Sequence, residues 1–384
     1  MIPTMSPKIL LLSVSAGAGH VRAAQAVQAA ARARGFEAEH IDVMDLVPKL
    51  FRKLYAESFI FMVNRNPALW GYLYHSSDRA KPDGTLAKLR RIIERVNTRK
   101  LAGAIADAAP THIISTHFLP SQLVGRMKAK DRLSQPLWTV VTDFDVHALW
   151  VQSNQDGFCV AADEIGWRLR DRLKALPDAD DATRATPIRD TGIPIAPGFS
   201  QPLDRAACAR ELGIDPAKIT FLLMSGGLGV GAIDQLAARI LAVPGDFQVV
   251  AMAGKNQELL TNLTRLGAAH PGRLQAVGFT TTPERLMAVA DLAITKPGGL
   301  TTSECLALGL PLLVVSPIPG QEERNSDFLL EHGAALKAHD GAGVEYRIRQ
   351  LLADPGRIAT LKRNARALGK PAAAKAVLDQ VLES

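Results

Sequence analysis

Side chains that can move a proton follow two predicted strands in the first half of the chain. His20 ends the turn SAGAGH and opens a predicted helix. Because a histidine titrates near neutrality, His20 could take a proton from an attacking alcohol. Asp143 and His147 follow the apolar segment LWTVVT, where they could line an acceptor site or form a proton relay. Alternatively, His20 is a helix cap or a surface residue and Asp143 caps a turn.

Two glycine-rich turns in the second half could hold a diphosphate. In each, an apolar strand runs into glycines and then into a helix, so that backbone N–H groups and the helix N-terminus face an anion. The turn residues are Ser225, Gly226, Gly227 and Leu228 in the first, and Gly298, Gly299, Leu300 and Thr301 in the second. One such turn is often only a tight connection, but two in one domain indicate a nucleotide diphosphate.

Polar side chains after the second turn could recognise the rest of a nucleotide sugar. Glu304 lies about one helical turn after Leu300, where its carboxylate could accept from both ribose hydroxyls. The loop SPIPGQEERN brings Gln321, Glu322 and Asn325 together, and such groups suit sugar hydroxyls, which both donate and accept. The alternatives are a glutamate that complements the helix dipole and a solvated polar loop.

These residues sit on alternating strands and helices, which predicts an α/β protein with parallel sheets. The strands KILLLSVS, THIISTH and LWTVVTD belong to a first domain, residues 1–200. The rhythm restarts after a linker rich in proline and glycine, with ITFLLMSGG, FQVVAMAG and LAITKPGG. We therefore expect two similar domains in tandem with a cleft between them.

Composition narrows the class of protein further. The chain has 384 residues and is 47% hydrophobic, which favours two domains, and it lacks an apolar run long enough to span a membrane. Three scattered cysteines argue against a disulfide framework and favour the cytoplasm. The net charge of +7 gathers between Lys49 and Arg132, with 16 Lys or Arg against 6 Asp or Glu. Charge alone admits both nucleic acid and the cytoplasmic leaflet as anionic partners.

Aromatic and basic residues are interleaved between residues 47 and 74. This segment holds seven of the 20 aromatic residues, together with Lys49, Arg52, Lys53 and Arg65. Such a pattern is typical of an interfacial helix that inserts apolar side chains while its cations meet lipid phosphates. Ordinary core packing is the alternative.

In their order, the motifs resemble the monogalactosyldiacylglycerol synthase and processive diacylglycerol glucosyltransferase family of glycosyltransferase family 28. That family is related to the lipid-intermediate GlcNAc transferase of peptidoglycan synthesis. In the first half the resemblance rests on GAGHVRAA, DLVPKLF, NRNPALWGYLY, STHFLP and TDFDVHALW. In the second half it rests on SGGLGVG, VGFT, TKPGGLTTSE and PGQEERN, and it covers nearly the whole chain.

The resemblance implies a GT-B fold of two Rossmann-like domains. The second domain, 201–365, would bind the UDP-sugar, and a C-terminal helix, 366–384, would cross back to the first. Phe279 and Thr280 would lie by the uracil and Glu304 by the ribose. The two glycine turns would hold the diphosphate, with Gln321, Glu322 and Asn325 near the sugar.

The resemblance further implies inversion at the anomeric carbon, which requires one base and no metal. We assign the base to His20, with Asp143 and His147 on the acceptor side, although His20 and Asp143 could exchange roles. The predicted reaction moves glucose or galactose from UDP to diacylglycerol at the inner face of the cell membrane. No cofactor and no nucleic acid is expected. The alternatives are a UDP-GlcNAc 2-epimerase and a non-catalytic, membrane-associated UDP-sugar sensor.

Overall fold

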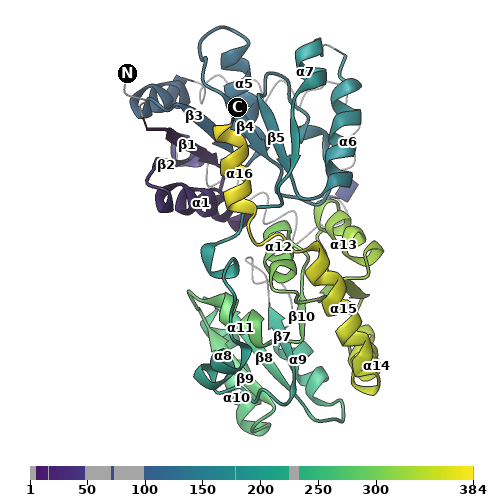
Figure 1. Ribbon diagram of the computed structural model, residues 1–384. Coiled ribbons are helices and arrows are strands. Elements are labelled where there is room, and N and C mark those ends of the chain that lie inside the picture. Colours follow the sequence, from purple (N-terminus) through teal and green to yellow (C-terminus); the bar gives the residue numbers. More distant parts are fainter. Residues whose placement is uncertain are drawn as a thin grey trace. The chain divides into compact units, whose positions relative to one another are not determined.

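The computed structural model describes residues 6–15, 17–47, 71–72, 99–177, 179–224 and 233–383. The chain divides into two compact units. Unit 1 comprises Met1–Pro197, Pro319–Gln321 and Ala372–Ser384, and unit 2 comprises Gly198–Ile318 and Glu322–Pro371. Each unit is built on one six-stranded sheet with helices packed on it (Figure 1).

The sheet of unit 1 has the strand order β2-β1-β3-β4-β5-β6, and all its neighbours are parallel. Its strands are β1 (Lys8–Ser13), β2 (Glu37–Asp42), β3 (His112–Ser115), β4 (Leu137–Val140), β5 (Gly157–Val160) and β6 (Ile188–Asp190). The inner strands are continuous apolar runs because both faces of a parallel sheet are covered. The chain leaves β1 toward β2 and later returns to β3 on the other side, so the strand order reverses between β1 and β3.

Helices of unit 1 cover both faces of that sheet. They are α1 (Ala18–Ala33), α5 (Phe118–Lys128), α6 (Asp163–Lys174), α7 (Asp181–Ala185) and α16 (Ala373–Leu382), with short helices η1 (Val43–Asp45) and η2 (Ala148–Trp150) and helical residues 99–108. The C-terminal helix α16 lies against α1 (Figure 1). Alanines on α1 let it approach closely, and Arg34 Nη1 bonds Asp379 Oδ1 at 2.6 Å.

The sheet of unit 2 has the order β12-β11-β10-β7-β8-β9 and is also parallel throughout. Its strands are β7 (Ile219–Met224), β8 (Phe247–Gly254), β9 (Leu274–Gly278), β10 (Leu292–Thr295), β11 (Leu312–Val315) and β12 (Ala335–Ala338). Its helices are α8 (Arg205–Leu212), α9 (Ile233–Leu241), α10 (Gln257–Ala269), α11 (Pro283–Val289), α12 (Gly299–Ala307), α13 (Gln321–Glu331), α14 (Gly341–Ala353) and α15 (Pro355–Leu368); the short helix η3 (Pro197–Phe199) joins the units. Here the strand order reverses between β7 and β10.

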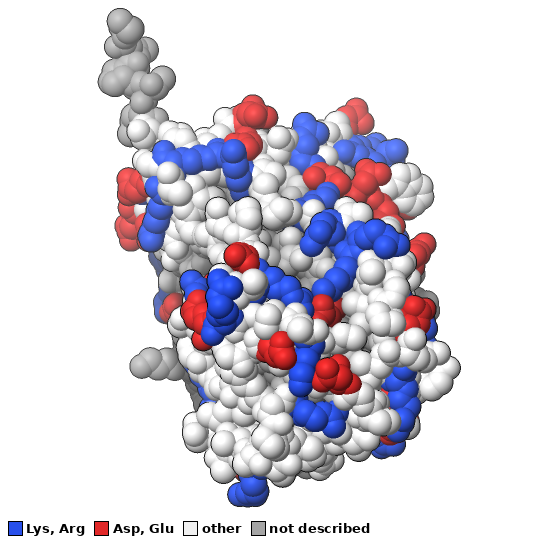
Figure 2. Space-filling model, turned by 60° about the horizontal axis from the view of Figure 1, so that its bottom comes forward, with Lys and Arg blue, Asp and Glu red and all other residues white. Residues whose placement is uncertain are grey.

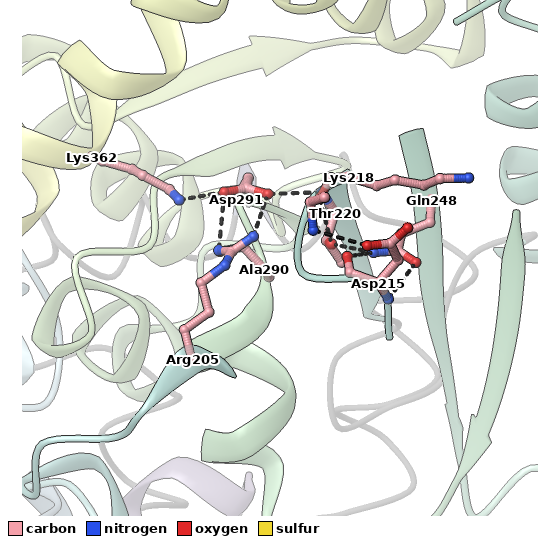
Figure 3. Close-up of polar contacts among 9 residues, drawn as sticks. Arg205, Asp215, Lys218, Thr220, Gln248, Ala290, Asp291 and Lys362 are labelled. Carbon is pink, nitrogen blue, oxygen red and sulfur yellow. Dashed lines mark hydrogen bonds and ion pairs between the residues drawn. The ribbon is translucent and has the colours of Figure 1, made fainter. Parts of the chain in front are cut away.

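An ionic cluster lies at the amino ends of β7 and β10 (Figure 3). Asp291 accepts from Arg205 Nη2 at 2.9 Å, from Lys362 Nζ at 2.5 Å and from the backbone N–H of Thr220 at 2.8 Å. Burial alone would raise the pKa of Asp291, but the Arg205 hydrogen bonds and the Lys362 ammonium outweigh it and hold that pKa below its usual value. The cluster therefore ties α8 and α15 to the sheet through one ionised carboxylate.

The structure confirms the α/β class with two parallel sheets, and the predicted strands of both halves are present. Two predictions fall largely outside the described residues: the basic and aromatic segment 47–74, of which Val47, Gly71 and Tyr72 are described, and the first glycine turn, Ser225 to Leu228. Of the described helices, none is long and apolar enough to cross a membrane.

Candidate active site

Four polar residues of unit 1 meet where the strand order reverses. His20 lies in the first turn of α1, Thr116 and His117 directly follow β3, and Thr142 follows β4. The carboxyl ends of parallel strands at such a reversal are where open α/β sheets bind ligands. The fold thus places the predicted base at the edge of the sheet that is suited to chemistry.

The imidazole of His20 is anchored through one nitrogen. Its Nδ1 lies 3.0 Å from the carbonyl oxygen of Thr116 and 2.9 Å from Oγ1 of Thr142. A carbonyl can only accept, so Nδ1 carries the proton and Nε2 keeps its lone pair. Burial lowers the pKa of His20 to about 4, although the bond to Thr116 acts in the opposite direction. His20 is therefore neutral at pH 7, as a general base must be.

Rings pack around His20 from the segments that follow β3 and β4. The ring of His117 stands edge-on to it at a centroid distance of 4.6 Å, and Trp150 lies 6.3 Å from both rings. His117 is 2% exposed, and burial and then the neighbouring His20 hold its pKa well below 6.5. The sequence interpretation missed His117 as a site residue, although the strand ending STHF carried the signal.

The other two predicted acceptor-side residues follow Thr142 along the chain. Asp143 is partly buried, and His147 is buried and caps η2 by accepting from the backbone N–H of Leu149 at 3.1 Å. The cap that was considered for His20 thus belongs to His147. The same segment carries Trp150, whose ring lies near His20, so the structure brings segment 142–150 beside His20.

In unit 2 the predicted diphosphate turns follow neighbouring strands. Leu292 of β10 pairs with Phe221 of β7, so the chain leaves both strands at the same edge of the sheet. Gly298 is the N-cap of α12 and accepts from the backbone N–H of Thr302 at 2.8 Å, which leaves the amides of the first turn directed at that edge. Gly299 and Leu300 begin the helix; the side chain of Leu300 is buried, so that only its backbone could meet an anion.

Side chains from α13 brace this turn. Asn325, fully buried, donates from Nδ2 to the carbonyl of Pro297 at 3.0 Å, and Glu322 Oε2 accepts from the N–H of Ile318 at 2.7 Å. Of the three residues predicted to recognise the sugar, Asn325 therefore holds the PGG turn and Glu322 holds the loop before α13, while sugar recognition stays a prediction. Gln321, the third, is the first residue of α13.

Lys296 was missed in the sequence although it stands inside TKPGG. It follows β10 directly, and burial lowers its pKa while the carboxylate of Glu322 raises it. A lysine beside a helix N-terminus adds a positive charge to an anion site. Glu304, on α12, is 1% exposed.

Phe279 and Thr280 follow β9 at the same edge. Phe279 is 64% exposed, unusual for a large apolar ring, and Lys255 Nζ lies 5.1 Å from its centroid. Thr280 Oγ1 accepts from the N–H of Thr282 at 3.1 Å and shapes the turn. An exposed aromatic ring here can stack on a base, as predicted for uracil, and the assignment stays a prediction.

Solved structures with the same arrangement are glycosyltransferases and related enzymes of the GT-B fold. MurG of Acinetobacter baumannii is 16% identical with a TM-score of 0.63, covering 98% of this chain and 100% of that one. A UDP-glucosyltransferase of Polygonum tinctorium is 14% identical with a TM-score of 0.66, covering 99% and 100%. A UDP-GlcNAc 2-epimerase of Neisseria meningitidis is 12% identical with a TM-score of 0.58, covering 98% and 100%. At such identities the likeness defines the fold, which is GT-B as predicted.

Sequence comparisons extend the likeness beyond the fold. Residues 20–195 match the monogalactosyldiacylglycerol (MGDG) synthase family, and residues 228–377 match the glycosyltransferase family 28 C-terminal domain. A processive diacylglycerol beta-glucosyltransferase of Bacillus pumilus (strain SAFR-032) is 28% identical over 383 residues, covering 98% of this chain and 94% of the relative. The enzyme of the same name in Bacillus subtilis (strain 168) is 26% identical over 383 residues, covering 98% and 95%. Over nearly its whole length the chain is therefore similar to glycolipid-forming glycosyltransferases of family 28, which confirms the resemblance seen in its motifs.

Proposed function

We propose that the protein transfers a glucosyl or galactosyl group from a UDP-sugar to the hydroxyl of diacylglycerol, with inversion, at the inner face of the cell membrane. The observation that carries this proposal is the neutral imidazole of His20, anchored through Nδ1 and keeping the Nε2 lone pair. It lies within the region that matches the MGDG synthase family. The names of the curated relatives supply the acceptor class and the donor sugar glucose.

The chemistry needs one base and one stabilised leaving group. His20 Nε2 takes the proton of the acceptor hydroxyl while that oxygen forms a bond to the anomeric carbon. The bond from that carbon to the UDP oxygen breaks on the opposite face, and UDP leaves with the electron pair. Amides at the start of α12 and the cation of Lys296 stabilise the charge that develops on the diphosphate.

Donor recognition is assigned to the carboxyl edge of the unit 2 sheet. Phe279 and Thr280 contact the uracil, Glu304 accepts from the ribose hydroxyls, and Gln321, Glu322 and Asn325 face the sugar. The exposure of Phe279 supports this division, because a ring that stacks on a base must be accessible. The glycine turns hold the diphosphate.

A groove in unit 1 supports the membrane location. It has a volume of about 1080 Å³ and lies between helical residues 99–108 and the end of α5. Ile105 and Met127 form buried parts of its wall. Its exposed charged residues are Arg99, Arg126, Lys130, Arg132 and Asp131, four cations against one anion. An apolar wall with a cationic rim suits the headgroups of an anionic leaflet. On the face that Figure 2 shows, by contrast, basic and acidic side chains are interspersed.

The test is sugar transfer by the full chain on vesicles that contain diacylglycerol and an anionic phospholipid. UDP-[14C]glucose and UDP-[14C]galactose are supplied separately, label in the lipid phase is counted, and proton NMR of the product gives its anomeric configuration. We expect label from one donor and an anomeric configuration opposite to that of the donor. Label that stays out of lipid with both donors would sink the proposal.

Two controls separate the alternative functions. A 2-epimerase would form UDP-ManNAc from UDP-GlcNAc without an acceptor, whereas a sensor would bind UDP and turn nothing over. The variant His20→Gln keeps the size and polarity of the side chain but lacks a basic nitrogen. It should bind UDP as the wild type does and transfer sugar about a thousandfold more slowly.

A further inference from the structure

Three histidines at the carboxyl edge of the unit 1 sheet each use Nδ1 to contact the backbone, but in opposite senses. His20 Nδ1 faces a carbonyl, that of Thr116, at 3.0 Å. His117 Nδ1 faces the N–H of Leu119 at 3.0 Å, and His147 Nδ1 faces the N–H of Leu149 at 3.1 Å. A carbonyl must accept and an N–H must donate, so the backbone dictates which ring nitrogen carries the proton.

The consequence is that the neutral rings are held in different tautomers. His20 has its proton on Nδ1 and a lone pair on Nε2. His117 and His147 have the lone pair of Nδ1 occupied and carry their proton on Nε2. Both can donate a hydrogen bond, but neither has a free lone pair that could compete for the acceptor proton, even though the rings of His117 and His20 are only 4.6 Å apart. His20 alone of the three is arranged as a base.

Two threonines hold His20 in this state. Thr116 forms two hydrogen bonds with His20. The carbonyl of Thr116 accepts from Nδ1 of His20, and Oγ1 of Thr116 donates to the carbonyl of His20 at 2.8 Å. Thr142 Oγ1 is a second acceptor, 2.9 Å from Nδ1. Thr116 and Thr142 lie 96 and 122 positions from His20 in the sequence, so the fold brings these contacts together. The two threonines are 0% and 5% exposed, so the contacts are shielded from water.

We propose that Thr116 and Thr142 are positioning residues that fix the Nδ1–H tautomer of His20, and that the Leu119 N–H fixes His117 in the opposite tautomer as a non-competing neighbour. The proposal rests on the proposed function for the meaning of His20 as base, but the tautomers themselves do not depend on it. In many enzymes a carboxylate orients a catalytic imidazole. Here a carbonyl and a hydroxyl perform that task, and both of these described partners of Nδ1 are uncharged.

The tautomers can be read directly by long-range proton–nitrogen NMR of the full chain with 15N-labelled histidine at pH 7. The signal of His20 is assigned by its loss in His20→Gln, and that of His117 by its loss in His117→Gln. We expect the Nδ1–H pattern for His20 and the Nε2–H pattern for His117. The Nε2–H pattern for His20, or Nδ1–H for His117, overturns the proposal even where sugar transfer is normal. Absence of transfer with the expected tautomers would instead count against the proposed function alone.

Variants of Thr142 test the positioning role. Thr142→Val removes one of the two acceptors at nearly constant volume, so kcat should fall about tenfold, the equivalent of about 1.4 kcal/mol, with KM for the UDP-sugar unchanged. Thr142→Ser keeps the hydroxyl and should restore kcat to within about twofold of wild type. A Val variant with wild-type kcat, or a loss that Ser does not rescue while both fold, contradicts the role of Thr142. UDP affinity and the melting temperature report that both variants are folded.

Discussion

The cluster around His20 in unit 1 and the cluster around Asp291 in unit 2 are both titratable groups taken partly out of water, and they respond in opposite ways. In both clusters burial disfavours the charged form, so it lowers the pKa of His20 and raises that of Asp291. Burial lowers the pKa of His20 to about 4, and the described partners of Nδ1, a carbonyl and a hydroxyl, are neutral and do not outweigh it, so the ring stays uncharged. Asp291 has Arg205 and Lys362, which outweigh burial, so the carboxylate stays charged.

The difference in partners means that His20 can change its charge, whereas Asp291 is held in its charged form. A base must be neutral before the reaction and charged after it, and neutral partners permit both states. An ion held between two cations would lose much of its interaction energy on protonation, so it serves to hold elements together. The chemistry of the partners, more than the depth of burial, distinguishes the two clusters.

The largest effect is expected at the base. His20→Gln should lower kcat by about a thousandfold, within the range for removal of a general base, while UDP affinity stays within about twofold. Initial rates with vesicle-bound acceptor and calorimetric titration with UDP give the two quantities. A loss of less than about tenfold would assign the base to another group, with Asp143 the first to examine by the same substitution to Asn.

The next effect concerns stability. Asp291→Asn leaves two cations beside an uncharged amide, so the free energy of unfolding should fall by about 3 kcal/mol. Urea unfolding of the full chain followed by circular dichroism measures it. Asp181→Asn is the matched control, because Asp181 forms an ion pair with Arg184 yet is fully exposed, and it should leave the midpoint unchanged. Equal midpoints for both variants would remove the distinction drawn for Asp291.

A second buried acid, Glu304, sharpens the comparison inside the proposed donor site. Glu304→Gln keeps the shape of the side chain but weakens a charge-assisted bond to the ribose, so UDP binding should weaken by about 1 to 3 kcal/mol. Calorimetric titration with UDP measures this change. Glu331→Gln, at the far end of α13, serves as the control. Unchanged affinity in Glu304→Gln would contradict the ribose role and leave Glu304 a structural residue.

The smallest effect is the pH dependence. Because the pKa of His20 is lowered to about 4, kcat/KM should change less than about threefold between pH 7 and pH 5 and fall only near pH 4. The same lowered pKa affects stability. As pH falls from 6.5 toward 4, the unfolded chain binds a proton at His20 while the folded chain does not, so the free energy of unfolding decreases over this range. Asp291, whose pKa is lowered, loses its contribution only as pH falls below the usual aspartate value of 3.8. An acid limb of kcat/KM centred near 6.5 would contradict the burial argument.

Much of the fold and of the candidate site was predictable from local pattern. Apolar runs of four to eight residues ending in glycine or a polar residue predicted the strands, and α12 begins at the second glycine of PGG as expected. His20 and Glu304 were singled out because each lies a short distance after a strand or a helix start, and their roles stay predictions. The stretches around Ser225 and from residue 47 to 74 remain predictions, because most of these residues lie outside those that the structure describes.

What the sequence determined by itself was the type and order of elements and the chemical nature of the residues that follow each strand. Only the tertiary structure decided which of them meet. Thr116 and Thr142 meet His20, and Lys362 meets Asp291. Asp379 of α16 meets Arg34, the C-cap of α1, across 345 positions of sequence. The physical reason is that the periodicity of a helix or a strand depends only on a few neighbouring positions in the sequence. Tautomers and pKa values depend on atoms within a few ångströms in space, and the folded backbone alone brings those atoms together.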